Sequence, residues 1–311
     1  MLAEDEHDDD RTCRKFFSLY NGMVLKKRIP GAVGKRCMES MGWLITLGKD
    51  EGEMSLLHPF SGVQIELPHQ NTTVSYAFHR TFKPWIYISK AVLSANPCHT
   101  SDYVLVVAEG RFAHLSLWRP GDLLWTRIME PTCKNVSDVV YFSGRLYTVS
   151  YGGYVRVYDV GGYEVKSHLI TQTVPWIAVP FRYDRERIPP RFITVEHDEE
   201  GALFMYRTNN FLVFEIDLDA NEAIPTRDLG DKAFFLGASA SLSVQASQFT
   251  GIRPNHIYFT DTNLNSCLYF DHGGGLDMGV FNLADGSIQP HYDGVSLSRF
   301  CPPIWVTPNP C

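Results

Sequence analysis

The sequence predicts an all-β protein, and three observations point to this fold class. Short runs that alternate apolar and polar residues recur along the chain, and turns that contain glycine separate them. No segment carries an apolar stripe at helical spacing over three turns, and 24 glycines and 18 prolines interrupt the chain throughout. Aromatic residues, which fit the pleated surface of strands, make up 13% of the chain. We therefore expect strands joined by tight turns.

The expected strands group into hairpins along the chain. In chain order they are residues 43–47 with 54–57, 103–108 with 114–118, 139–142 with 146–149 and then 155–158, and 191–196 with 203–206 and then 212–216. Each pair turns at a glycine, as at Gly48, Gly110, Gly144 and Gly201. Alternating strands that break at such turns are typical of antiparallel hairpins.

These hairpins form a loose repeat. The corresponding turns at Gly110, Gly144 and Gly201 are 34 and then 57 residues apart, which brackets the roughly 40–50 residues of a propeller blade. One small sheet cannot bury both of its faces, so repeated sheets stack around a ring and cover one another. The sequence therefore predicts a β-propeller of antiparallel blades, about six or seven in number.

Charge and hydropathy argue against two classes of partner. The net charge of −7 and the isoelectric point near 5.9 are opposite to the basic excess of a phosphate-binding domain, so we expect no nucleic acid. No apolar run is long enough to span a membrane, and the first residues lack the pattern of a secretory signal. We expect a cytoplasmic or nuclear protein that does not bind a membrane.

The amino-terminal residues and the cysteines complete the outline. The acidic run from Glu4 to Asp10 predicts a disordered tail over residues 1–13, with one propeller domain over residues 14–311. Seven cysteines are scattered without a Cys-x-x-Cys pair, so we expect free buried thiols.

The sequence carries no motif for catalysis, for a cofactor or for a metal. None of the eleven histidines has metal-ligand spacing, and residues 197–200, His-Asp-Glu-Glu, are typical of a solvated turn between strands. Residues 237–239, Gly-Ala-Ser, lack the second glycine of a nucleophile elbow. The glycine pair at 152–153 and triplet at 273–275 do not precede Lys-Ser or Lys-Thr, so they indicate flexible loops. We expect no catalytic, cofactor-binding or metal-binding residue.

The six tryptophans mostly fall in strand patterns, which favours packing between blades over exposed binding anchors. In the block 118–122, Trp-Arg-Pro-Gly-Asp, we expect a strand end followed by a turn in which Asp122 accepts backbone N–H bonds. Trp125 is then expected to pack the next strand.

Six blocks of sequence, taken together, resemble one family. In chain order they are residues 14–19 with 42–44, 58–68, 118–122 with 125–126, 228–237, 254–261 and 302–308. The second block resembles the family stretch Asn-Pro-x-Thr-Gly-x-x-Ile-x-Leu-Pro, with His58 in place of the usual asparagine. The family is that of plant F-box-associated β-propellers of the kink-suppressor type, catalogued mainly as a domain of unknown function. The resemblance spans about residues 14 to 308.

The resemblance implies a role in protein recognition. Typical members resemble substrate receptors of cullin-type ubiquitin ligases, in which an F-box holds the ligase and the propeller holds the target protein. Only fifteen residues precede Phe16, too few for a helical F-box. We therefore expect a propeller without an F-box that binds a protein target and does not dock a Skp-type ligase subunit.

A partner-binding surface is expected on loops at one end of the ring, where side chains are not needed for the core. Residues 181–190 form the most polar candidate loop. Its Arg182, Tyr183, Arg185 and Arg187 are the candidate contact residues, because tyrosine and arginine are enriched at interface hot spots. The competing interpretation is an ordinary solvated insertion.

Two functions of different classes follow. The first is a non-enzymatic protein-recognition propeller that resembles the substrate-binding half of F-box subunits. The alternative is a propeller that binds a small molecule or a sugar, with or without catalysis, through polar groups that converge on a pocket in the channel. A family member that has lost its role is a third interpretation.

Overall fold

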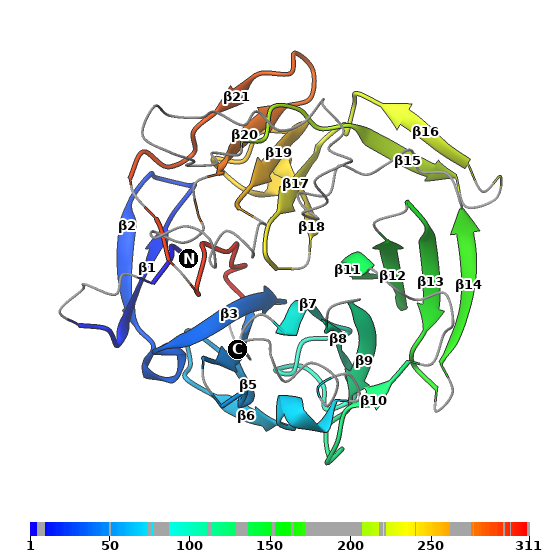
Figure 1. The fold of residues 1–311 in the computed structure, drawn as a ribbon. Coiled ribbons are helices and arrows are strands. Elements are labelled where there is room, and N and C mark those ends of the chain that lie inside the picture. Colours follow the sequence, from blue (N-terminus) through cyan, green and yellow to red (C-terminus); the bar gives the residue numbers. More distant parts are fainter. Residues whose placement is uncertain are drawn as a thin grey trace, which may run out of the picture.

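The described residues form six β-sheets, which are arranged in a ring (Figure 1). The structure is a computed structural model, and it describes residues 1–4, 10–49, 51–73, 76, 87–110, 113–128, 136–150, 153–162, 165–171, 207–217, 220, 222–239, 241–261, 275, 277–294, 296–298 and 300–309. The described elements are strands and three short 3-10 turns, η1 (Pro30–Ala32), η2 (Gln70–Thr72) and η4 (Ala246–Gln248). The predicted all-β propeller is confirmed.

Three blades are antiparallel meanders of four strands. The first blade contains β3 (Lys35–Ser40), β4 (Trp43–Gly48), β5 (Met54–Leu57) and β6 (Gln64–Leu67). The second blade contains β7 (Ile88–Leu93), β8 (Leu105–Glu109), β9 (His114–Trp118) and β10 (Thr126–Arg127). The third blade contains β11 (Val136–Phe142), β12 (Arg145–Ser150), β13 (Val155–Asp159) and β14 (Lys166–Thr171). The hairpins expected in this half of the chain are all present.

The other half of the ring is less regular. A five-stranded blade has the order β18-β17-β19-β20-β21, and its central pair, β17 with β19, is parallel. Its strands are β17 (Lys232–Leu236), β18 (Leu242–Gln245), β19 (His256–Phe259), β20 (Gly279–Asn282) and β21 (Ile288–Gln289). Two-stranded sheets are formed by β1 (Cys13–Phe17) with β2 (Val24–Arg28) and by β15 (Val213–Asp217) with β16 (Glu222–Thr226). The described residues thus form four blades of four or five strands and two smaller sheets.

Neighbouring blades are held together by shared apolar cores. The first and second blades enclose a cluster that includes Trp43 and Trp125, and the second and third blades enclose one that includes Leu117 and Tyr158. The Trp125 indole N–H also donates to the carbonyl oxygen of Pro68 at 2.9 Å, which links the second blade to the first. The expected role of the tryptophans in packing between blades is confirmed for these residues.

The turn after β9 connects the second blade to the third. The Asp122 carboxylate accepts the N–H of Arg119 at 3.0 Å, as the sequence predicted. The Arg119 guanidinium donates to the carbonyl oxygens of Val160 and Gly162, each at 2.8 Å. This sequence block therefore fastens two blades together.

The ring closes where the two ends of the chain meet (Figure 1). The N–H of Ile304 donates to the carbonyl oxygen of Met1 at 3.0 Å, and the N–H of Glu4 donates to that of Cys301 at 3.3 Å. The Trp305 indole N–H donates to the carbonyl oxygen of Leu236 in the five-stranded blade. Residues 300–309 thus join the first blade to the five-stranded blade.

The cysteines are of two kinds. Cys37 and Cys301 are buried free thiols, and Cys13 is a half-buried one. Cys98 is disulfide-bonded, so the expectation of free thiols is wrong for this residue. The sequence signal failed here because cysteine spacing along the chain does not report which cysteines the fold brings together.

Candidate protein-binding groove

The turn between β5 and β6 is built on a buried histidine. The backbone N–H of Ser61 donates to Nδ1 of His58 at 3.1 Å, the bond that an asparagine oxygen makes in an Asx turn. Nε2 of His58 then donates to the carbonyl oxygen of Asn309 at 2.9 Å. His58 therefore makes the bond that an asparagine makes in an Asx turn, and it also ties this turn to the carboxyl-terminal segment.

This buried histidine supports an exposed aromatic ring at the tip of the turn. The His58 ring lies 5.3 Å from the Trp43 ring on one side and 6.0 Å from the Phe60 ring on the other. The Phe60 ring lies 6.2 Å from that of Phe16 in β1, yet 43% of its surface is exposed. Phe60 is thus held in a fixed position while it faces solvent.

The hairpin of β1 and β2 faces this turn and also exposes apolar side chains. Its own turn is closed by the N–H of Ser18, which donates to the carbonyl oxygen of Met23 at 2.9 Å. Leu25 is the cross-strand partner of Phe16, and 54% of its surface is exposed. Fourteen large hydrophobic side chains are exposed among the described residues, and six of them lie on these two hairpins: Tyr20, Met23, Val24, Leu25, Phe60 and Val63.

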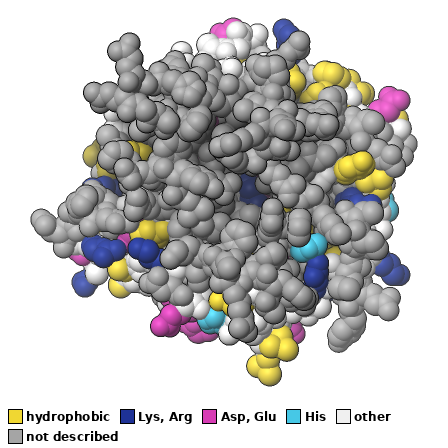
Figure 2. Space-filling model, viewed as in Figure 1, with side chains coloured by type: hydrophobic (Ala, Val, Ile, Leu, Met, Phe, Trp, Pro, Cys, Tyr) yellow, Lys and Arg dark blue, Asp and Glu magenta, His cyan; other side chains and the backbone are white. Residues whose placement is uncertain are grey.

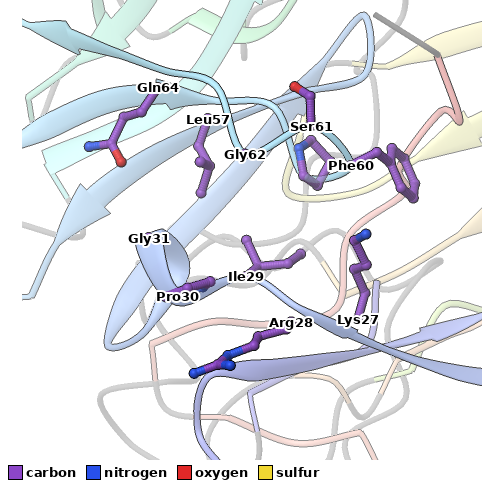
Figure 3. A pocket seen from close by; sticks show the side chains of 11 residues that line it. Lys27, Arg28, Ile29, Pro30, Gly31, Leu57, Phe60, Ser61, Gly62 and Gln64 are labelled. Atoms are coloured by element: carbon purple, nitrogen blue, oxygen red, sulfur yellow. The ribbon is translucent and has the colours of Figure 1, made fainter.

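A groove of about 360 Å³ lies between the two hairpins (Figure 3). One side is formed by residues 27–31 and the other by residues 57, 59–62 and 64. Leu57 and Ile29, each 3% exposed, supply the buried apolar part of its lining. Gly31 keeps the groove open, because a Cβ atom there would lie 3.1 Å from the Leu57 side chain and 3.1 Å from that of Gln64.

The charged residues among those described as lining this groove are both basic. They are Lys27 and Arg28, and these described lining residues include no aspartate or glutamate. In Figure 3 the Lys27 side chain extends toward Phe60. Figure 2 shows Lys and Arg side chains beside hydrophobic ones at the left edge of the molecule, where Figure 1 places the β1–β2 sheet. A positive, partly apolar groove on a protein of net charge −7 favours an anionic partner.

A buried ion pair holds the β1–β2 sheet against the ring. The Arg14 guanidinium lies 3.0 Å from the Glu4 carboxylate and donates to the carbonyl oxygen of Ala32 at 2.5 Å. The thiols of Cys37 and Cys301 lie close to this pair. A hydrogen bond from Cys37, with the Arg14 charge, lowers the pKa of Cys301 to about 6, and the same bond raises the pKa of Cys37. These buried groups position the groove without reaching its surface.

The centre of the ring contains a second set of polar groups. The Lys90 ammonium of β7 donates to the carbonyl oxygens of Gly237 and Ser239, each at 2.8 Å, and lies 3.3 Å from the Asp138 carboxylate of β11. The Ser241 hydroxyl donates to the other oxygen of Asp138. This network joins the second and third blades to the segment between β17 and β18.

Glu39 of β3 belongs to a neighbouring part of the centre. Its carboxylate accepts the N–H of Gly42 at 2.7 Å and the hydroxyl of Thr307 at 2.6 Å. Burial raises the pKa of Glu39. The described polar groups of the centre therefore bond to one another rather than converge on an open pocket.

Other sequence-based candidates have different outcomes. The loop residues Arg182, Tyr183, Arg185 and Arg187 lie outside the described residues, as does the turn at 197–200. Within the described ranges, no group of three or more His, Cys, Asp or Glu side chains could hold a metal ion. No helix in those ranges is long and apolar enough to cross a membrane.

Sequence reasoning missed the groove residues, although two signals point to them. The turn 58–62, His-Pro-Phe-Ser-Gly, carries a large aromatic residue at a position where turns are usually polar. The strand 24–28, Val-Leu-Lys-Lys-Arg, does not alternate apolar and polar residues as a half-buried strand does. Neither signal shows that the two segments face each other, because they are about thirty residues apart in the sequence.

The sequence of this chain matches a known protein family. The model of the KIB1-4 beta-propeller family matches residues 16–282, most of the chain. The chain belongs to this family. The match begins at Phe16 in β1 and extends to the end of β20, so it includes the β5–β6 hairpin and most of the β1–β2 hairpin. The expected plant F-box-associated propeller family is confirmed.

Curated relatives of the chain are F-box proteins of Arabidopsis thaliana. F-box protein At4g35733 is 24% identical over 301 residues, which cover 83% of this chain and 74% of the relative. F-box protein SKIP23 is 24% identical over 314 residues, which cover 87% of this chain and 76% of the relative. F-box protein At2g17690 is 34% identical over 105 residues, a shorter match that covers 32% of this chain and 22% of the relative.

Proposed function

We propose that this chain is a non-enzymatic protein-recognition propeller, related to the substrate-binding half of F-box subunits of cullin-type ubiquitin ligases, and that it binds a protein through the groove between the β1–β2 and β5–β6 hairpins. The observation that carries the proposal is the pair of hairpins, which hold exposed apolar side chains on both sides of a basic groove. The F-box names of the relatives support a role in protein binding.

The physical character of the groove fits the centre of a protein interface. Interface hot spots combine aromatic anchors with fully desolvated pockets, and they are surrounded by contacts that exclude water. Phe60 supplies a preorganised aromatic side chain, because His58 and Phe16 fix its position before a partner arrives. An anchor that is already ordered loses little conformational entropy on binding.

Affinity purification with a matched pair of variants tests this proposal. Phe60→Ser removes the aromatic anchor, which is 43% exposed, while Leu123→Ser changes an apolar residue, 87% exposed, in the turn between β9 and β10. We expect wild type and Leu123→Ser to retain a protein partner from the native cell that Phe60→Ser loses. A partner retained equally by all three would overturn the assignment of the groove.

The loop of Arg182, Tyr183, Arg185 and Arg187 is proposed as a second contact to the same partner. Replacing the three arginines with alanine should weaken capture without abolishing it. If the loop variant loses the partner and Phe60→Ser does not, the loop is the main contact and the groove is not.

The compartment and the ligase connection have direct tests. We propose that the protein works in the cytoplasm or the nucleus, which imaging of a fluorescent fusion would establish. Residues 1–311 alone are expected not to bind a purified Skp-type ligase subunit in a pull-down. Direct binding of that subunit would show that docking needs no further segment.

A further inference from the structure

The two basic side chains of the groove differ in their surroundings. Lys27 is half-buried and forms no ion pair in the described part of the chain. Arg28 is exposed and lies close enough to Asp10 for its charge to act on that carboxylate. On the adjacent strand, the Arg14 side chain is buried against Glu4. Lys27 is therefore the basic side chain that is available to an anion in the groove.

A simpler explanation of these charges is incomplete. Lysines on an exposed edge strand often prevent it from pairing with another chain. An edge strand protected in this way usually has polar neighbours as well. Here the neighbours are exposed and apolar, namely Met23 and Leu25 on the same hairpin and Phe60 across the groove. Edge protection alone therefore does not account for this combination of side chains.

The shape of the groove restricts what it can accept. β2 pairs only with β1 among the described strands and lies at the outer rim of the ring (Figure 1). A volume of about 360 Å³ is at the lower end of the range of roughly 300–1,000 Å³ for small-ligand pockets. It is thus suited to one or two side chains of an extended segment that follows the rim, rather than to a folded domain.

One face of β2 carries an apolar and then a basic side chain as the strand reaches the groove. Leu25 and Lys27 are two residues apart on one strand, so their side chains project to the same face of the β1–β2 sheet. That face is the one on which Phe16 contacts Phe60. An extended segment with an apolar residue two positions from an acidic one would place each beside its complement.

We propose that the groove binds a short, extended acidic segment of a partner protein, with an apolar side chain between Leu25 and Phe60 and a carboxylate at Lys27. This inference rests on the proposed function in protein recognition, and it adds the chemistry of the segment that is recognised. Carboxylate recognition by a cluster of basic side chains beside an apolar anchor is an established mode of peptide binding.

Fluorescence anisotropy with synthetic peptides tests the inference. The probe is a fluorescein-labelled octapeptide in which leucine or phenylalanine stands two positions from aspartate or glutamate, with serine between them. Matched peptides replace the carboxylates with amides, replace them with lysine, or replace the apolar residues with serine. We expect the acidic apolar peptide to bind about tenfold or more tightly than each matched peptide, with an affinity that falls as salt rises.

Charge-matched protein variants separate a local effect from a general one. The variant Lys27→Gln removes one positive charge from the groove. The control Lys166→Gln removes one from an exposed position in β14. We expect the groove variant to lose about tenfold in affinity and the control to change by less than about twofold. Leu25→Ser should also weaken binding, with an unchanged unfolding temperature as evidence that it folds.

Several outcomes would overturn the inference. These are equal affinity for the acidic and amide peptides, equal losses in the two charge variants, or binding only when the peptide is phosphorylated. The proposed function can survive such a result. If Phe60→Ser still loses a cellular partner while no acidic peptide binds, the groove recognises a protein by other chemistry. If Phe60→Ser keeps that partner, the proposed function of the groove fails independently.

Discussion

The centre of the ring and the groove at its rim both carry charged side chains, but they use them in opposite ways. At the centre, Lys90 and Asp138 bond to each other and to neighbouring backbone and hydroxyl groups. In the groove, Lys27 lies beside exposed apolar side chains without an ion pair in the described residues. Polar groups that bond internally hold the blades together, whereas polar groups left open beside apolar ones are available to a partner.

The largest expected effect is at the centre. Lys90→Met removes the donor to two carbonyl oxygens and the countercharge of Asp138, and both side chains are less than a quarter exposed. We expect the free energy of unfolding to fall by about 3 kcal/mol, since buried acceptors lose their partner. The midpoint of urea denaturation at constant slope measures this change.

The matched control for this variant is Lys232→Met, at an exposed position of β17. Its unfolding free energy should change by no more than about 0.5 kcal/mol. If the two variants lost equal stability, the network at the centre would not be what joins the blades, and the contrast with the groove would disappear.

The histidine below the groove gives the next largest effect. His58→Ala removes both the Ser61 and the Asn309 hydrogen bonds at a site that is 1% exposed, and should cost about 2 kcal/mol. His58→Asn supplies an oxygen that can accept the Ser61 N–H, so its cost should be about 1 kcal/mol or less. Thermal unfolding of both variants checks the order. A larger loss for asparagine than for alanine would contradict the Asx-turn role of His58.

A smaller effect is expected at the rim of the groove. Gly62 has a φ of +77°, and a Cβ atom there would meet nothing within 4 Å. Gly62→Ala should therefore cost about 1 kcal/mol from backbone strain alone. Gly161→Ala, at a glycine outside the left-handed region with an ordinary contact at 3.6 Å, should be neutral or stabilising by up to about 1 kcal/mol. If both variants lowered the denaturation midpoint relative to wild type by the same amount, this explanation would be refuted.

The same contrast shows how far the sequence could predict this molecule. Strand alternation and glycine turns predict the hairpins of the first three blades, because both signals are local. The parallel pairing of β17 with β19 could not be predicted, since it depends on contacts between segments separated in the sequence. Asp122 in its turn was predictable for the same reason as the hairpins, because its hydrogen bond to Arg119 spans only three residues.

The groove and the central network were not predictable because both depend on contacts that only the closed ring creates. Lys90 meets Gly237 across 147 residues of sequence, and Phe60 meets Phe16 between different sheets. Residue type favoured Arg182, Tyr183, Arg185 and Arg187 as contacts, but residue type does not tell which exposed side chains lie beside one another. The sequence therefore predicts the blades better than it predicts the groove or the central network.

The smallest effect is a pH dependence that arises at the centre. Burial raises the pKa of Glu39 above its ordinary value of 4.5, so the folded chain binds this proton more tightly than the unfolded chain does. The stabilisation from Glu39 is therefore complete below pH 4.5 and is lost as the pH rises through the raised pKa. Glu39→Gln keeps an oxygen to accept the Gly42 and Thr307 bonds but cannot ionise. Denaturation midpoints measured across this pH range should show that the variant gains stability relative to wild type as the pH rises. Glu215→Gln, at an exposed strand position, is the control for the loss of one negative charge. The stability difference between Glu39→Gln and wild type could instead stay constant as the pH rises, or change in favour of wild type. Either result would mean that the buried Glu39 carboxylate carries no desolvation cost, and the centre would then not differ from the open groove in this respect.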